Sequence, residues 1–185
     1  VVLRNGWYNE NYTAGIQEDL AHGAHFGSAG EGRISSAARA DYAAAAAAVL
    51  TASESQAGKV YELAGDRSYT LSEFASEVTR QSGKRVVYND LPQGQYKAAL
   101  LNAGLPEFVA HLLAHSDAAA PEGALFDDAR QPTRLLGRAT TPPAVRVTAA
   151  LNPSRPLPEK GHPALAHPPA PPLPSRCLPP TPAMS

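Results

Sequence analysis

Leu3-Arg4-Asn5-Gly6-Trp7-Tyr8-Asn9-Glu10-Asn11-Tyr12 is the stretch of sequence that says most about the fold of this chain. The apolar residues before it predict a β-strand that ends near Asn5. Asn5-Gly6 predicts a sharp turn, because both residues tolerate positive φ. Ligands of α/β sheets bind beyond the carboxyl ends of the strands, so Trp7 and Tyr8 are candidates for the wall of a cleft. A hairpin turn with two half-buried aromatic side chains explains these residues equally well.

Composition narrows the class of protein. The chain has 185 residues and a net charge of -1, which fits one ordinary domain and does not indicate a nucleic-acid or anionic-membrane partner. It contains no apolar run of about 18 residues. The single cysteine, Cys177, excludes an intrachain disulfide and a cysteine-based zinc site. We therefore expect a cytoplasmic protein that binds neither nucleic acid nor membrane.

The two ends of the sequence differ from its middle. The only methionine is Met184 and the chain opens directly in an apolar run, so we expect an N-terminal part to be missing. Twelve of the 18 prolines lie between Pro153 and Pro182. Such a segment buries too little apolar area to offset its ordering entropy. We predict a folded region over residues 1–150 and a disordered proline-rich tail over 151–185.

The hydrophobic spacing predicts alternating helices and strands through the first half of the chain. Thr70 and Glu73 form the spacing of a capping box, which predicts a helix start. The predicted elements are a helix over 12–20 ended by Gly23, a helix over 39–50, a strand over 59–64, a helix from Thr70 to Gly83 and a strand over 85–88. Strand, capped helix and strand in this order predict a βαβ unit.

Helices are predicted for most of the second half. Tyr96, Leu100 and Leu101 form one apolar face before Gly104. Pro106 suits the first turn of a second helix, in which Phe108, Val109, Leu112 and Leu113 lie at i, i+1, i+4 and i+5. Asp127-Asp128 is expected to cap a helix that contains residues 133–136, because adjacent carboxylates point in different directions and suit acid–base chemistry poorly.

Several residues invite a functional interpretation. His111 and His115 have metal-ligand spacing, but no H-E-x-x-H pattern and no third ligand accompany them, so we predict no metal site. The glycines between Gly27 and Gly32 do not follow the dinucleotide fingerprint. Arg39 and Asp41 suit an ion pair or cap at a helix start, and they could also point into a cleft.

The order of motifs resembles the C-terminal half of the NmrA-like family of atypical short-chain dehydrogenases, and most of all its NAD(P)H:quinone oxidoreductases. The resemblance begins with Arg4-Asn5-Gly6-Trp7-Tyr8-Asn9-Glu10-Asn11-Tyr12 and continues with Arg33-Ile34-Ser35-Ser36-Ala37-Ala38-Arg39-Ala40-Asp41-Tyr42-Ala43. Residues 59–66, 81–84, 123–128 and 136–142 extend it in the same order, so that it covers the chain to about residue 147.

The resemblance implies an α/β fold that is the C-terminal part of a Rossmann-like NAD(P)-binding fold, with the N-terminal βαβ units missing. It implies NADPH as cofactor, a quinone as substrate and hydride transfer between them. It also implies that the cofactor is contacted by six consecutive residues: Asn5, Gly6, Trp7, Tyr8, Asn9 and Glu10. No catalytic residue follows from it, and a homodimer is left open.

Departures from the family pattern lead to a second set of expectations. The strand and glycine-rich turn that hold the pyrophosphate in the family have no counterpart in this sequence. We therefore expect the chain alone to be inactive and to bind NADPH weakly or not at all. Because NmrA-like proteins also include non-catalytic redox sensors that bind dinucleotides, a sensor is the alternative to an enzyme. Tyr8, Tyr12 and Asp41 are the candidates for a proton donor, and none is favoured.

Overall fold

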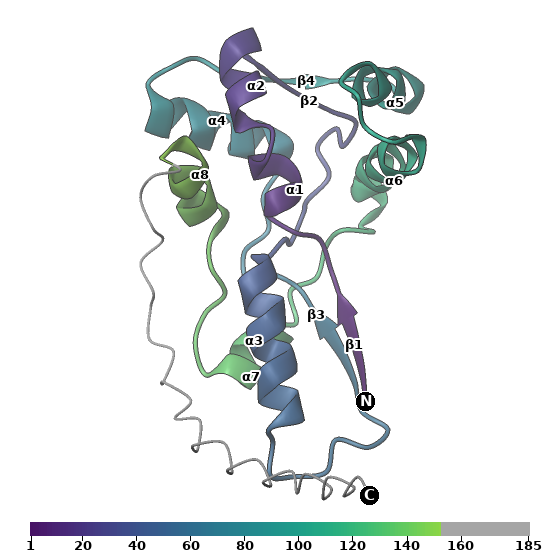
Figure 1. Cartoon of the computed structure of the whole chain (residues 1–185), viewed down its shortest axis with the longest axis vertical. Coiled ribbons are helices and arrows are strands. Elements are labelled where there is room, and N and C mark those ends of the chain that lie inside the picture. The colour runs from purple at the N-terminus through teal and green to yellow at the C-terminus, as the bar shows by residue number, and fades with distance from the viewer. Residues whose placement is uncertain (153–185) are drawn as a thin grey trace, which may run out of the picture.

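The computed structural model describes residues 1–152, which form a mixed α/β structure with parallel strands (Figure 1). Its elements in chain order are β1 (Val2–Asn5), α1 (Glu10–Thr13), α2 (Ile16–His22), β2 (Ala24–Gly27), α3 (Arg39–Leu50), β3 (Val60–Leu63), α4 (Leu71–Ser82), β4 (Val87–Asp90), α5 (Gln93–Asn102), α6 (Glu107–Ala118), a 3-10 turn η1 (Ala120–Glu122), α7 (Gln131–Leu136) and α8 (Pro143–Leu151). The predicted proline-rich tail lies outside the described residues, apart from its first two positions. None of the helices within residues 1–152 is both long and apolar enough to cross a membrane.

The strands form two separate parallel pairs rather than one sheet. β1 pairs with β3, with Val2 opposite Val60 and Asn5 opposite Leu63. β2 pairs with β4, with Ala24 opposite Val87. The predicted unit of β3, α4 and β4 is therefore correct in its element types and order but wrong as a βαβ unit, because its two strands belong to different pairs.

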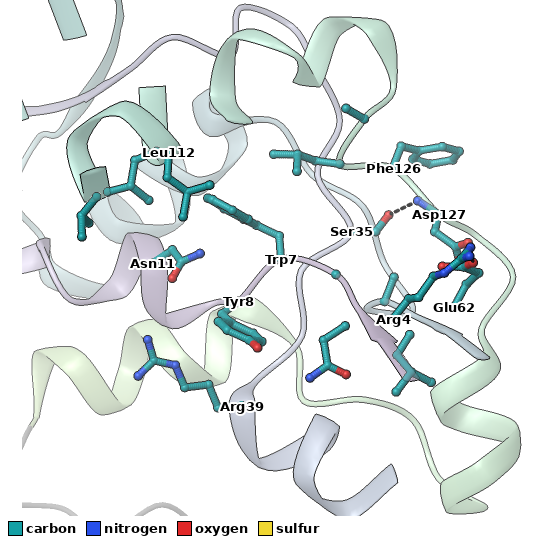
Figure 2. A pocket seen from close by; sticks show the side chains of 18 residues that line it. Arg4, Trp7, Tyr8, Asn11, Ser35, Arg39, Glu62, Leu112, Phe126 and Asp127 are labelled. Carbon is teal, nitrogen blue, oxygen red and sulfur yellow. Dashed lines mark hydrogen bonds and ion pairs between the residues drawn. The ribbon is translucent and has the colours of Figure 1, made fainter. Parts of the chain in front are cut away.

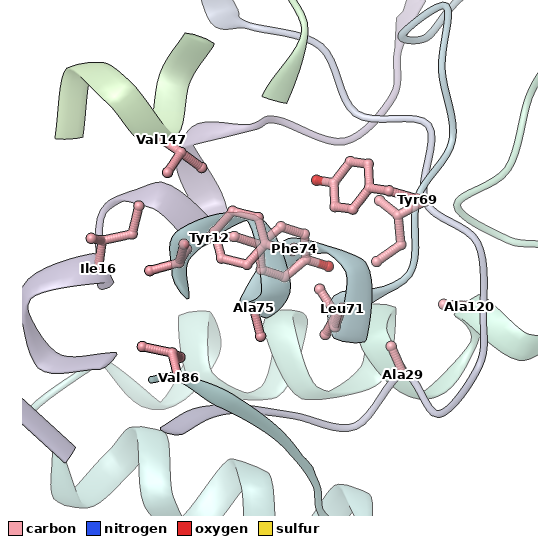
Figure 3. Close-up of a cluster of buried hydrophobic side chains, with 12 residues drawn as sticks. Tyr12, Ile16, Ala29, Tyr69, Leu71, Phe74, Ala75, Val86, Ala120 and Val147 are labelled. Carbon is pink, nitrogen blue, oxygen red and sulfur yellow. The ribbon is translucent and has the colours of Figure 1, made fainter. Parts of the chain in front are cut away.

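The larger hydrophobic cluster surrounds α4, between the β2–β4 pair and helices α1, α2 and α8 (Figures 1 and 3). The predicted stripe of α4 is confirmed, because Leu71, Phe74, Ala75 and Val78 are all buried. The capping box is confirmed as well. Glu73 donates its backbone N–H to Thr70 Oγ1 at 3.1 Å, and Thr70 N–H donates to Glu73 Oε2 at 3.0 Å.

A smaller cluster supports the β1–β3 pair. Its buried members are Ala37, Tyr42, Ala45 and Leu63. α3 extends over Arg39–Leu50 as predicted, and its alanines allow it to approach other elements closely. Short α7 packs against both α3 and β3 and completes this end of the molecule (Figure 1).

Four local predictions were wrong. The single helix expected over 12–20 is two helices, α1 and α2, separated at Gly15. The strand expected over 85–88 lies two residues later, at Val87–Asp90. Neither Asn5 nor Gly6 has positive φ. Asp127 does not cap α7; it accepts the N–H of Ala129 at 2.9 Å within the preceding loop, and no side chain caps that helix.

Candidate functional site

A cleft of about 640 Å³ lies at the carboxyl ends of β1 and β3 (Figure 2). Asn5, Gly6, Trp7 and Tyr8 line it from the end of β1, and Leu63 and Ala64 line it from the end of β3. This is where parallel α/β structures bind their ligands. The expectation that Trp7 and Tyr8 lie beside a cleft is therefore confirmed, and the hairpin interpretation is wrong because β1 pairs with a distant parallel strand.

Gly6 lies at this position because two backbones approach closely there, not because the turn needs positive φ. Its N–H donates to the carbonyl oxygen of Leu63 at 2.8 Å. A Cβ atom at position 6 would lie 2.9 Å from that same oxygen. The pair Asn5-Gly6 therefore predicted the position of the cleft correctly. The glycine is needed for close backbone packing, however, and not for a positive φ.

The backbone of Trp7 is held from behind by the smaller cluster. The Trp7 carbonyl oxygen accepts the Ala37 N–H at 3.1 Å and the Tyr42 hydroxyl at 2.9 Å. Burial raises the pKa of Tyr42 far above its ordinary value of 10.0, so this hydroxyl stays protonated and donates. The aromatic wall of the cleft therefore has a fixed backbone.

A cation lies beside the ring of Tyr8. The guanidinium carbon of Arg39 is 5.4 Å from the centre of that ring, a cation–π distance. The opposite support is Tyr42, whose ring packs edge-on against Tyr8 with centroids 5.2 Å apart. Of the two functions considered for Arg39, lining the cleft is the one observed.

The other wall of the cleft comes from α6 and the segment 124–127. Val109, Leu112 and Leu113 line the cleft, whereas Ala110 and Ala114 on the other side of the helix are buried. The helix predicted after Pro106 is confirmed, and its larger apolar residues face the cleft. The size of the side chains distinguishes the two faces of α6. The small alanines pack closely against neighbouring elements, and the larger residues line the cleft.

Ser35 joins the two strand ends to this second wall, and the sequence analysis did not single it out. Its N–H donates to the Leu125 carbonyl oxygen at 2.8 Å, and its Oγ accepts the Asp127 N–H at 3.1 Å (Figure 2). Its own carbonyl oxygen accepts the Gly65 N–H at 2.8 Å. The two residues of the Asp127 contact are 92 positions apart in sequence, so no local sequence pattern predicts it.

A buried hydrogen bond links the two walls of the cleft. The Tyr12 hydroxyl donates to Asp117 Oδ1 at 2.8 Å, which ties α1 to α6. Burial raises the pKa of the Asp117 carboxyl above its ordinary value of 3.8, and the hydrogen bonds from Tyr12 and Ser28 oppose that rise. Burial also raises the pKa of Tyr12, as do the Asp117 charge and hydrogen bond. Tyr12 is thus a structural donor rather than a readily available acid.

Asn9 and Glu10 do not line the cleft. Asn9 is buried, and its Oδ1 accepts the Ser36 hydroxyl at 2.6 Å. Glu10 accepts the Arg39 N–H at 3.2 Å, at the start of α3, and pairs with Arg146 at 3.0 Å. Both residues hold the segment that follows Tyr8 against neighbouring elements.

Asp41 also lies outside the cleft. Its carboxylate is buried, pairs with Arg138 at 2.8 Å and accepts the Thr141 N–H at 2.7 Å. The ion pair or cap expected from Arg39 and Asp41 at the helix start was wrong, because Asp41 pairs with a residue 97 positions away and neither of their side chains caps α3. Of the three candidate proton donors, only Tyr8 lines the cleft.

Two further features lie away from this cleft. His111 and His115 stack with ring centroids 5.9 Å apart, and within residues 1–152 no three potential ligands are grouped as a metal site would require. A second cavity of about 340 Å³ lies beside Asp66, Arg67 and Arg130. Asp66 accepts the Thr133 hydroxyl at 2.6 Å and the Thr140 N–H at 2.7 Å, so its carboxylate serves to connect β3 to the α7 region.

Comparison with known proteins places these residues in context. No protein-family model matches the chain. The chain is 50% identical over 151 residues to quinone oxidoreductase 2 of Escherichia coli, a match that covers 82% of this chain and 52% of that protein. The chain thus spans about half the length of this curated relative.

Solved structures of reductases also match part of their length to this chain. The structure of the E. coli NADPH-dependent quinone oxidoreductase QOR2 complexed with NADPH matches with a TM-score of 0.77 and 50% identity, covering 80% of this chain and 52% of that one. The triphenylmethane reductase of Citrobacter sp., complexed with NADP(H), matches with a TM-score of 0.73 and 31% identity, covering 80% and 51%. The chain is therefore similar in sequence and fold to part of two reductases that were solved with NADPH or NADP(H) bound.

Proposed function

We propose that the chain forms the substrate side of an NADPH-dependent quinone reductase of the NmrA-like family of atypical short-chain dehydrogenases. The observation that carries the proposal is the cleft at the carboxyl ends of β1 and β3, lined by Trp7 and Tyr8. It lies in a chain that is 50% identical to a quinone oxidoreductase. Its volume of about 640 Å³ is within the range of roughly 300–1,000 Å³ that small-molecule sites occupy.

The cleft residues suit a planar ring with carbonyl groups. Trp7 and Tyr8 offer aromatic surfaces, and Arg39 supplies a cation at the Tyr8 ring. The Trp7 Nε1 atom is buried and has no hydrogen-bond partner within residues 1–152. A buried donor without a partner costs roughly 1–3 kcal/mol, so a shift of the indole that brings Nε1 to a ligand carbonyl would be favoured. NADPH supplies the hydride in this chemistry.

Asn5, Gly6, Trp7 and Tyr8 are the residues that we propose to contact the nicotinamide end of the cofactor or the quinone. Asn9 and Glu10 act through them in this proposal, because their side chains hold the segment after Tyr8 in place. The phosphate groups of NADPH need other residues. Gly27 and Gly32 pack against Leu71 and Ala120, and the segment after them leads to Arg39 through a loop, not through the strand–turn–helix that cradles a pyrophosphate.

Quinone binding to this chain tests the first half of the proposal. Trp7 is the only tryptophan, so quenching of its fluorescence by a small benzoquinone reports directly on the cleft. We expect saturable quenching that weakens at least about tenfold in Tyr8→Ala, which removes one aromatic surface worth roughly 1–3 kcal/mol. Leu50→Ala, at the exposed end of α3, is the matched control and should bind like the parent. Quenching that never saturates would contradict the proposal.

Hydride transfer is tested with a chimera. The part of E. coli quinone oxidoreductase 2 that this chain does not match is joined to this chain, and NADPH oxidation is followed with and without quinone. Quinone-dependent oxidation supports the enzyme, whereas NADPH binding without turnover supports a redox sensor. The chain alone is expected to show no measurable NADPH binding, and micromolar affinity would overturn that expectation. Cytoplasmic location and a homodimer stay predictions.

A further inference from the structure

One side of the cleft is much more apolar than a small quinone ring requires. The helical spacing places Phe108, Val109, Leu112 and Leu113 on one face of α6. Of these residues, Val109, Leu112 and Leu113 line the cleft, as does Phe126 from the segment after η1. Figure 2 shows Leu112 and Phe126 on the two sides of Trp7. Exposure is high for such residues: 76% for Phe108 and 45% for both Leu112 and Phe126. Large contiguous apolar surfaces on soluble proteins mark binding sites.

This apolar surface is continuous with the cleft. Val109, Leu112 and Leu113 line the cleft together with Trp7, and Phe108 lies one helical turn from Leu112 towards the solvent. Because residues at i and i+4 share a face of a helix, the surface forms one track of roughly 6 Å per turn from the aromatic wall outwards. A flexible hydrocarbon chain can follow such a track, whereas a planar head group cannot fill it.

The opposite end of the cleft is polar. Arg4 and Glu62 form an ion pair at 2.6 Å there, and Figure 2 shows them with Asp127 on the other side of Trp7 from Leu112. A ligand with one polar end and one apolar end would therefore bind in a single direction. The head would lie by Trp7 and Tyr8, and the apolar part would lie along α6.

We propose that the apolar surface formed by Phe108, Val109, Leu112 and Leu113 on α6 binds the hydrocarbon side chain of a quinone. The proposal rests on the proposed function and names the substrate class more narrowly, as quinones that carry a long alkyl or prenyl substituent. The surface adds affinity through burial of apolar area and takes no part in hydride transfer.

The test compares two quinones with the same head group, ubiquinone-0 and decylubiquinone. Both are titrated against Trp7 fluorescence in the 185-residue chain. A tenfold gain in affinity corresponds to burial of about two methylene groups. The decyl chain can bury more than that, so decylubiquinone is expected to bind at least about tenfold more tightly. Decanol serves as the control for detergent-like effects and should compete with decylubiquinone but not with ubiquinone-0.

Substitutions then locate the hydrocarbon chain. Leu112→Gln and Phe108→Gln should both reduce the affinity ratio of the two quinones towards one. Phe108 does not line the cleft, so Phe108→Gln should also leave ubiquinone-0 binding unchanged. Leu50→Gln makes the same chemical change at an exposed leucine on α3 and should leave the ratio unchanged. Phe108 is 76% exposed, so its variant tests the idea even if Leu112→Gln misfolds.

The outcomes separate this proposal from the proposed function. Saturable binding of both quinones with equal affinity would overturn the side-chain proposal and leave quinone binding standing. A tight preference for decylubiquinone that survives both α6 substitutions would also overturn it. Absence of saturable binding by either quinone would overturn the proposed function itself.

Discussion

The two parallel strand pairs of this molecule are built on very different amounts of hydrophobic core. The β2–β4 pair belongs to a cluster of twelve buried residues around α4, of which only three are alanines. The β1–β3 pair rests on only four buried residues, two of them alanines. The cleft is at the end of the pair with the smaller core.

This difference suggests that one pair supplies most of the stability and the other carries the binding site. Packing around α4 supplies most of the stability, because stabilisation grows with the apolar area removed from water. The strand ends around Trp7 are positioned mainly by directed backbone contacts, from Leu63, Ala37 and Tyr42. The following substitutions test that division, in order of expected effect.

Phe74→Ala should have the largest effect on stability. Phe74 is 3% exposed and packs among Tyr12, His25 and Tyr69, so its truncation leaves a large cavity that costs about 3–5 kcal/mol. Leu63→Ala, in the smaller cluster, should cost about 2 kcal/mol, at the low end of such changes. Urea unfolding measures both. An equal or larger loss in Leu63→Ala would contradict the division.

Gly65→Ala should damage the cleft more than the fold. A Cβ atom at this position would overlap the Ser36 carbonyl oxygen, so the backbone beside Ser35 must move. Overpacking of this kind costs about 1–3 kcal/mol, and we expect quinone quenching of Trp7 to weaken with it. Gly94→Ala in α5 is the control, because open space surrounds that position, and it should stabilise the chain by about 0.5–1 kcal/mol. Unchanged quinone affinity in Gly65→Ala would show that the strand ends tolerate the shift.

Asp117→Asn should change how stability depends on pH. The folded-state pKa of Asp117 is raised, so the folded chain holds this proton more tightly than the unfolded chain does. Stability from this group is therefore greatest at low pH and falls as pH rises from about 3.8 through the raised value. Urea unfolding of both proteins over a pH series gives the difference. The parent should lose stability relative to the Asp117→Asn variant across that window, and parallel curves would exclude the raised pKa.

Tyr42→Phe should have the smallest effect on stability and a local effect on the cleft. It removes the hydroxyl that donates to the Trp7 carbonyl oxygen at 2.9 Å, which costs about 0.5–1.5 kcal/mol. Tyr61→Phe is the matched control, since it removes a hydroxyl that donates to Gln56 at 2.6 Å, on the β3 side. Only Tyr42→Phe should change Trp7 emission in the folded protein. An equal change in both variants would show that the contact with Trp7 has no special function.

Features encoded by neighbouring residues could be predicted from the sequence. The capping box at Thr70, the alanine-rich α3 and the strand before Asn5 were correct, because propensity and side-chain period act within one turn or one strand. Trp7 and Tyr8 were correctly expected beside a cleft, from the position of Asn5-Gly6 after a strand.

Features that depend on distant partners could not be predicted. Which strand pairs with which, the Ser35 contacts with residues 125 and 127 and the Arg138 partner of Asp41 all join residues far apart in sequence. The spacing of the apolar residues in α6 predicted the helix but not what that side contacts, because the same spacing describes a core face and the wall of a cleft. Only the burial of Ala110 and Ala114 decides between them.

The interleaved order of the strands has a consequence for synthesis and folding. β2 is made between β1 and β3, and β3 between β2 and β4, so neither pair is a local hairpin. Arg4 and Glu62, which face each other across the first pair, are 58 residues apart, and Gly30 and Asp90 beside the second are 60 apart. Contacts between residues so far apart in sequence slow folding. The entropy of closing the intervening loop is lost before the contacts stabilise the chain. On the ribosome, the strand carrying Asn5 emerges before β3 and cannot form this pair until Leu63 has also emerged.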